Sequence, residues 1–225
     1  PPFPEIPSDL PTRGSISADP NNPKVINQNG YYPSISLGGS SKLTIDVGAS
    51  DRIIVVDRLS IGGNADTTIN YNGGGELILF ILDTFSMGNR FPANDEFDPN
   101  NLIIYYKGTK DFNIANSYKL TGSLYVEKAN LLMAGSGSVV GHILSGGKKV
   151  TINNGSVSHV KVLFAPNAHV EMAGGGGLKG ALICKSFNIS NGATLEYDNS
   201  ILGTFPGLVE SIGSGSTHYT RGLWR

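Results

Sequence analysis

Seven short apolar strands recur along this chain at a spacing of about twenty residues. They begin at Ile53, Leu77, Leu102, Leu124, Ile143, Leu163 and Leu182. Self-similarity at such a period is typical of stacked architectures, because a single unit cannot bury its apolar face alone. The repeat predicts a solenoid, a fold class that hosts enzymes, adhesins and passive scaffolds alike.

A second strand in the later repeats has apolar residues at both ends and, in three of four cases, a polar residue between them. These strands are Leu131–Met133, Val150–Ile152, Val170–Met172 and Phe187–Ile189. Alternation with period two turns the apolar residues to one face. We therefore expect two inward columns, made of Val150, Ile152, Val170, Met172, Phe187 and Ile189.

A third short strand follows at Val139, Val157, Leu178 and Leu195, after a corner rich in glycine. Glycine adopts positive φ without a steric penalty, as tight corners require. Three strands and three corners in about nineteen residues describe one turn of a parallel β-helix. The predicted fold is therefore all-β, a right-handed parallel β-helix of about seven turns.

The first strand of each repeat is a nearly continuous apolar run, as at residues 53–56, 77–82 and 102–106. Such runs indicate strands covered on both faces, here by the chain's own ends or by another subunit. Tyr105, Tyr106 and Tyr125 form either an exposed aromatic patch for a sugar or peptide, or part of this packing.

Three regions interrupt the repeat. Residues 1–34 are rich in proline and are expected to form an extended lead-in to a solenoid at residues 35–200. Residues 88–101 are an insertion, and residues 201–225 are expected to cap the open end. The plausible capping residues are Phe205, Leu208, Val209 and Ile212. Because the sequence starts at Pro1 instead of Met, we expect a mature or trimmed product, and removal of a targeting or anchoring segment is compatible with that expectation.

Composition narrows the possible partners. Lys and Arg total 17 and Asp and Glu total 18, which gives a net charge of −1 and no electrostatic footprint for nucleic acid or an anionic membrane. No stretch approaches the length of a membrane span, so we expect no direct membrane insertion by this segment. The single cysteine, Cys184, is interpreted as a small buried apolar residue.

No catalytic constellation is visible. Glu127, Glu171 and Glu196 fall on the exteriors of different faces, whereas glycosidic chemistry needs converging carboxylates. His142 and Lys161 occupy equivalent places and are expected to form a polar outward column. No set of residues has zinc spacing. We predict that the protein is not an enzyme, with no catalytic, cofactor-binding or metal-binding residues.

The insertion holds a cluster of oxygen-bearing side chains, Asn94, Asp95, Glu96, Asp98 and Asn100. Such a cluster could bind calcium, but its spacing is not that of a known calcium loop, and a solvated turn is the simpler interpretation. Loops that interrupt a solenoid often carry its binding function. Asn94, Asp95, Glu96 and Asp98 are therefore the candidate contact loop.

One segment resembles a known family. Residues 162–186 contain Phe164-Ala165-Pro166-Asn167-Ala168, a glycine-rich corner at residues 174–177, and Gly180 followed by an apolar strand. Tyr197-Asp198 follows one turn later, and Trp224 lies near the end. This pattern is similar to the β-solenoid domain of bacterial pilin-like surface proteins associated with type IV pili.

The resemblance implies an extracellular solenoid on the bacterial cell surface, with no catalytic residues to carry over. Its partners would be other pilus or cell-surface subunits, and its ligand a surface, a glycan or DNA. The motif is expected to be structural: Pro166 fixes φ at a corner, Asn167 takes a left-handed turn, and Gly174, Gly177 and Gly180 serve the backbone at corners. Two alternatives stay open, a bactofilin-type polymer that stacks end to end and a carbohydrate-active β-helix enzyme.

Overall fold

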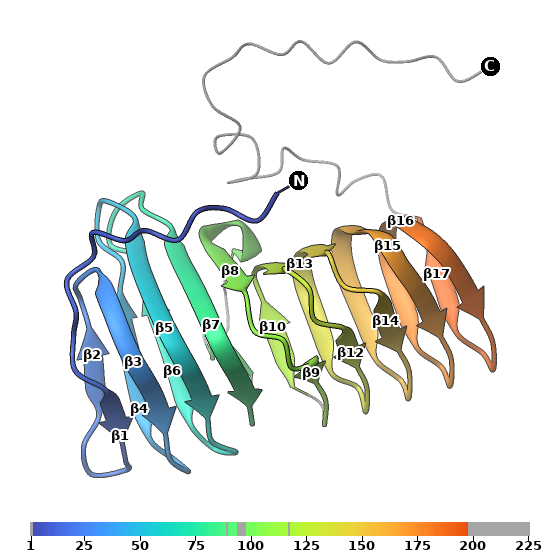
Figure 1. Ribbon diagram of the computed structural model, residues 1–225. Coiled ribbons are helices and arrows are strands. Elements are labelled where there is room, and N and C mark those ends of the chain that lie inside the picture. The colour runs from blue at the N-terminus through green and yellow to red at the C-terminus, as the bar shows by residue number, and fades with distance from the viewer. Residues whose placement is uncertain (1, 89, 94–97, 117, 198–225) are drawn as a thin grey trace.

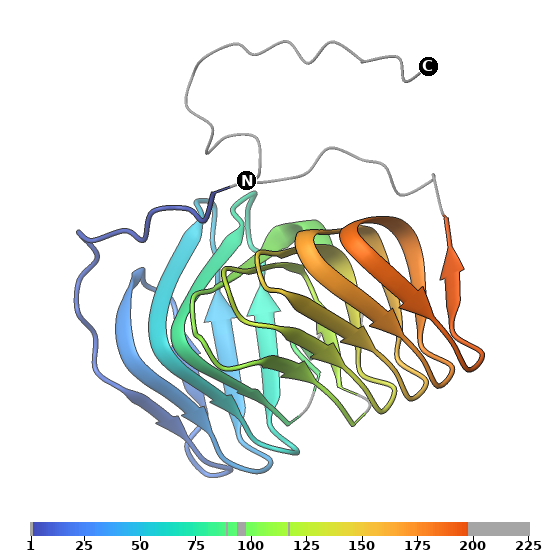
Figure 2. The same ribbon diagram turned by 45° about the vertical axis from the view of Figure 1, so that its right-hand side comes forward.

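The computed structural model describes residues 2–88, 90–93, 98–116 and 118–197. Short strands in this part pair in parallel and wind into a β-solenoid of about nine turns, shown from two directions in Figures 1 and 2. The predicted all-β parallel solenoid is confirmed. The predicted number of turns is too low, because the winding begins at β1 (Ile16–Ala18), well before the first strand recognised in the sequence.

The turns have three faces, which we call the first, second and third face in chain order. Parallel pairing continues along each face from one turn to the next. On the first face, Val55, Phe80 and Tyr105 are register partners in successive turns. The strands that contribute to the first face are β3 (Gly30–Leu37), β5 (Arg52–Ile61), β7 (Leu77–Met87), β8 (Leu102–Tyr106), β11 (Ser123–Val126), β13 (Ser138–Ser145), β15 (Val157–Met172) and β16 (Gly177–Ile189).

The second and third faces complete each turn. The second face takes β1, the later parts of the long strands β3, β5, β7, β15 and β16, and the short strands β9 (Phe112–Ile114), β12 (Leu131–Met133) and β14 (Lys149–Ile152). The third face takes β2 (Lys24–Ile26), β4 (Lys42–Asp46), β6 (Asp66–Asn70), β10 (Lys119–Thr121), the first parts of β13, β15 and β16, and β17 (Thr194–Glu196).

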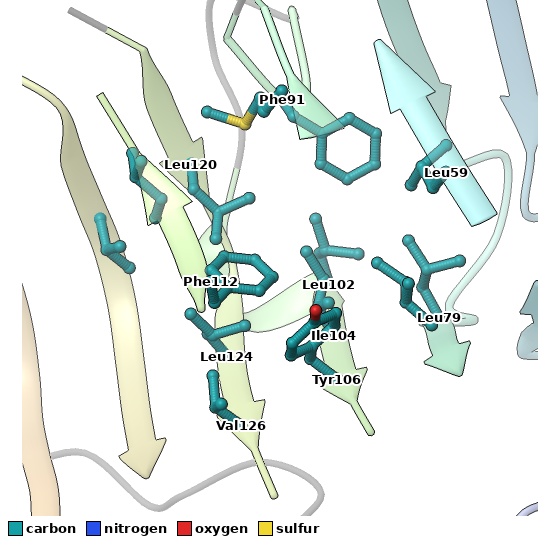
Figure 3. Close-up of a cluster of buried hydrophobic side chains, with 14 of the residues drawn as sticks. Leu59, Leu79, Phe91, Leu102, Ile104, Tyr106, Phe112, Leu120, Leu124 and Val126 are labelled. Carbon is teal, nitrogen blue, oxygen red and sulfur yellow. The ribbon is translucent and has the colours of Figure 1, made fainter. Parts of the chain in front are cut away.

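The inward side chains of all three faces form one continuous core. Figure 3 shows part of it, where Phe91, Phe112 and Tyr106 fill the interior between aliphatic residues of neighbouring turns. Val150, Ile152, Val170 and Met172 are fully buried, as the alternation predicts. Phe187 and Ile189 continue the same register but are 57% and 38% exposed, so their predicted burial is wrong. They belong to the last described turn, above which no described strand lies.

The resembling motif forms a corner of the solenoid, and the conformation predicted for Asn167 needs one correction. Ala165 and Ala168 are fully buried inside the corner between the first and second faces, and Pro166 and Asn167 between them are exposed. Asn167 does not adopt positive φ, so its predicted left-handed turn is wrong. The left-handed residues lie instead at the next corner, between the second and third faces, as at Asn154 and Asn191.

Glycines of the motif serve two corners. Gly174 adopts positive φ at the corner between the second and third faces. Gly180, with φ of 137°, lies between the third and first faces, where a Cβ atom would collide with the carbonyl oxygen of Val160. Gly177 does not adopt positive φ, and a Cβ atom there would lie 3.0 Å from Oγ1 of Thr194.

The outer side of the first face is covered by the chain's own N-terminal segment. Phe3, Ile6 and Leu10 pack on a second apolar cluster that is separate from the inner core. Its buried members are Val55, Phe80, Ile103, Tyr105, Tyr125 and Leu144. The expected cover on both faces of these strands is thus confirmed, and Figure 1 shows the segment crossing the upper ends of the strands. Tyr105, Tyr106 and Tyr125 are buried, so they form no exposed patch.

Candidate functional site

The first part of the insertion at residues 88–101 is built into the solenoid. The Phe91 amide donates to the carbonyl oxygen of Lys119 at 2.8 Å, and the Thr121 amide donates to the carbonyl oxygen of Phe91 at 2.9 Å. The Ala93 amide donates to the carbonyl oxygen of Thr67 at 2.7 Å. Residues 91–93 therefore join β6 to β10 and complete the third face. The Phe91 side chain is 1% exposed and belongs to the core.

A polar groove of about 210 Å³ lies where the insertion meets the outer side of β4 and β6. In the parallel ladder below it, Lys42 is the register partner of Asp66, and Thr44 is the partner of Thr68. Arg90 contributes from the insertion. The described lining residues are Lys42, Leu43, Thr44, Asp66, Thr68, Arg90 and Ala93. The groove thus brings two cations, one carboxylate and two hydroxyl groups together on an exterior face.

Of the four predicted contact residues the structure describes Asp98, and Asp98 is not among the described residues that line the groove. Asn94, Asp95 and Glu96 lie outside the described residues. Asp98 begins the short 3₁₀ turn Pro99–Asn101, and its carboxylate accepts the Asn100 amide at 2.9 Å. The far end of the insertion is held on a later turn, because Nζ of Lys161 donates to Oδ1 of Asn100 at 3.2 Å.

The groove was not predicted from the sequence, and the reason can be identified. Lys42 and Asp66 stand on strands that alternate apolar and polar residues, Lys42–Asp46 and Asp66–Asn70, but the earliest strand recognised in the sequence begins at Ile53. That their side chains lie next to each other on the outer face can be recognised only when the register between the two turns is known. Arg90 joins them because Phe91, the next residue, is fixed in the third face.

His142 is buried and does not belong to a solvent-exposed polar column. Its side chain is 2% exposed. Burial, and then the positive charge of Lys161, lowers the pKa of His142 from 6.5 to about 4. The equivalent Lys161 is half-buried beneath the insertion. The burial of His142 was not predicted, and its imidazole is neutral at physiological pH.

Two of the carboxylates expected on the exterior, Glu171 and Glu196, are ion-paired there. Glu171 pairs with Lys149 at 2.9 Å, and Glu196 with Lys179 at 3.2 Å. The hydrogen bond from Lys149 holds the pKa of Glu171 below its usual value. Among the described residues, no group of three or more His, Cys, Asp and Glu side chains is arranged to hold a metal ion. In the same part of the chain, no helix is long and apolar enough to cross a membrane.

The C-terminal end of the solenoid carries a second exposed feature. Ile183, Phe187, Ile189 and Leu195 are all more than one third exposed there. A hollow of about 550 Å³ lies among the residues Leu182–Phe187 and Leu195. Cys184 lines this hollow and is half-buried, and burial raises the pKa of its thiol. The predicted C-terminal cap at residues 201–225 lies outside the described residues.

The comparisons with known proteins give a family. A family described as domain of unknown function DUF7305 matches the chain over residues 15–153 and again over residues 142–204. No curated protein sequence and no solved structure matches this chain significantly. The two matched segments together reach from the first turn of the solenoid to just beyond β17.

Proposed function

The chain belongs to the DUF7305 family, and we propose that it is a non-catalytic binding module on the bacterial cell surface, associated with type IV pili. The observation that carries the binding role is the groove between the insertion and β4–β6. It is the place where charged side chains from different turns meet around a hollow. Its ligand is proposed to be a glycan with acidic groups.

The chemistry of the groove supports this ligand class. Lys42 and Arg90 can bind a carboxylate or sulfate, and Asp66 can accept hydrogen bonds from sugar hydroxyls. The hydroxyl group of Thr68 can both donate and accept hydrogen bonds. A volume of about 210 Å³ is below the range of about 300–1,000 Å³ for sites that enclose drug-sized molecules. The groove would therefore hold one sugar unit of a chain that continues into solvent.

DNA fits the same surface less well. Neutralising a run of phosphates needs several Lys and Arg side chains on one face, and affinity falls with each contact that is missing. The groove offers two cations beside a carboxylate, on a chain of net charge −1.

The surface location is supported by the resemblance of the Phe164–Ala168 segment to pilus-associated solenoids. Pili sheared from the native cells should contain the protein, and intact cells should bind an antibody against it. A protein confined to internal filaments would contradict this proposal and support the bactofilin-type polymer instead.

That polymer is the second candidate, because one observation favours it: the apolar residues left exposed at the C-terminal end. Such an end could stack on another copy. The two ends of the described solenoid differ, however, because the inward residues Ala18 and Ile26 at the N-terminal end are buried.

A further inference from the structure

A column of outward apolar residues runs along the first face through seven turns. We call it the outer column: Val55, Phe80, Tyr105, Tyr125, Leu144, Phe164 and Ile183, each the register partner of the next. The N-terminal segment covers its beginning, where Val55 is 2% exposed. The residues of the outer column become more exposed toward the C-terminal end, where Phe164 is half-buried and Ile183 is 49% exposed.

The outer column therefore leads into the open C-terminal end. Ile183, Phe187 and Leu195 all line the hollow of about 550 Å³. Phe187 is 57% exposed and Leu195 is 39% exposed. The last turn also presents strand edges that no further described strand pairs with, and such edges invite association unless something covers them. We call Ile183, Phe187, Ile189 and Leu195 the end surface.

The N-terminal end of the solenoid offers no matching surface for head-to-tail stacking. Its inward residues Ala18 and Ile26 are 2% and 1% exposed. Pro20 and Pro23 lie at the corner between β1 and β2, and proline lacks the amide that an added strand would need. Among large apolar residues of β1 and β2, Val25 is exposed, but its partner Thr44 lies on the outer side of the third face.

We propose that the end surface is the docking site of the chain's own C-terminal segment, residues 201–212. Four residues separate this segment from the end of β17, so the short connection keeps it near the end surface at an effective concentration of about millimolar. Its sequence is apolar at Ile201, Leu202, Phe205, Leu208, Val209 and Ile212, and a Gly/Ser-rich stretch follows at residues 213–217. The opposite end of the chain already covers the outer column by the same kind of apolar contact.

This docking would keep the solenoid monomeric. The segment would occupy the hollow, cover the exposed apolar residues and block the open strand edges against a second copy. The inference is independent of the glycan-binding role, since the groove lies on the third face several turns away.

Cys184 provides the test, because it is the single cysteine of the chain and it lines the hollow. In the full-length protein, the rate of alkylation by N-ethylmaleimide is measured in wild type and in the double variant Phe205→Ser/Leu208→Ser. We expect at least about a tenfold faster reaction in the double variant, with an unchanged far-UV circular dichroism spectrum. Tyr219→Ser, beyond the Gly/Ser-rich stretch, is the matched control and should react like the wild type.

Sedimentation at several protein concentrations separates the possible occupants. A monomer whose Cys184 is protected at every concentration supports the proposal. Protection that grows with concentration, together with dimers in the wild type, would show that a second copy covers the end surface and would overturn it. Equal alkylation rates in wild type and double variant would overturn it as well.

Discussion

The ring of Phe3 packs edge-on against the ring of Tyr125, with 5.2 Å between their centroids. Phe3 makes a second edge-on contact with Tyr105, at 5.8 Å. The N-terminal residues are thereby fixed to turns that the chain forms much later. They are part of the folded domain, and the solenoid has an outer apolar cluster in addition to its inner core.

Phe3→Ala should weaken this attachment. Because Phe3 is partly exposed, we expect a loss of about 1–2 kcal/mol in the free energy of unfolding, measured by urea denaturation. Near-ultraviolet circular dichroism should also change, since Tyr105 and Tyr125 lose an aromatic neighbour. The exposed Glu5→Ala serves as control and should leave both signals unchanged. A Phe3→Ala variant as stable as the wild type would show that the segment contributes nothing to folding.

Phe91 and Phe187 should differ in their effect on stability. Phe91→Ala leaves a cavity in the core and should cost about 3–5 kcal/mol. Phe187→Ala, in the last turn, should cost about 1–2 kcal/mol, because no further described turn packs above Phe187 and the proposed docked segment can leave the end surface more easily than a core strand can. Thermal and urea unfolding of both variants check this order. The reverse order would mean that the insertion is not part of the core.

Gly180→Ala should destabilise the corner between the third and first faces. The added Cβ atom would collide with the carbonyl oxygen of Val160, and the positive φ of Gly180 strains any other residue. We expect a loss of about 1–3 kcal/mol in unfolding free energy. Gly14 has no atom within 4 Å of an added Cβ and no positive φ. Gly14→Ala should therefore be neutral, and equal effects of the two substitutions would contradict the corner geometry.

His142 should make the fold sensitive to acid. Its pKa is about 4 in the folded protein and 6.5 when unfolded, so the unfolded chain binds one more proton between these values. Stability is therefore full above pH 6.5 and falls as the pH drops from 6.5 to 4, by up to about 3 kcal/mol.

His142→Gln isolates this contribution. Between pH 7 and pH 4, the unfolding free energy of the wild type should fall by up to about 3 kcal/mol more than that of the variant, because the variant lacks the titrating group. Parallel curves would show that the imidazole does not titrate in this way. The ion pair of Glu171 with Lys149 contributes equally to both proteins and cancels in the comparison.

Repetition explains what the sequence could predict. The alternation of Val150–Ile152 and Val170–Met172 indicates strands that are buried on one face. The continuous apolar run at residues 102–106 indicates a strand that is buried on both faces. Such local patterns determine which residues turn inward. They do not tell which turn is the last, so the exposure of Phe187 could not be predicted from its pattern.

The groove and the burial of His142 depend on contacts between distant segments. Lys42 and Asp66 meet through strand register, and Arg90 is positioned by the pairing of Phe91 with Leu120. His142 shares its surroundings with Lys161, which the insertion contacts through Asn100. None of these relationships has a signature within one repeat, which is why periodicity could not reveal them.

The most direct test of the proposed function is binding of the folded protein to a surface coated with an acidic polysaccharide such as alginate. Wild type is compared with Lys42→Ala/Arg90→Ala and with Lys148→Ala, an exposed lysine in the corner between β13 and β14. We expect that wild type and Lys148→Ala bind alike, that the double variant loses at least about tenfold in affinity, and that the polysaccharide is not shortened. Equal binding by all three proteins would contradict the groove as the binding site, and depolymerisation of the polysaccharide would contradict a non-catalytic function.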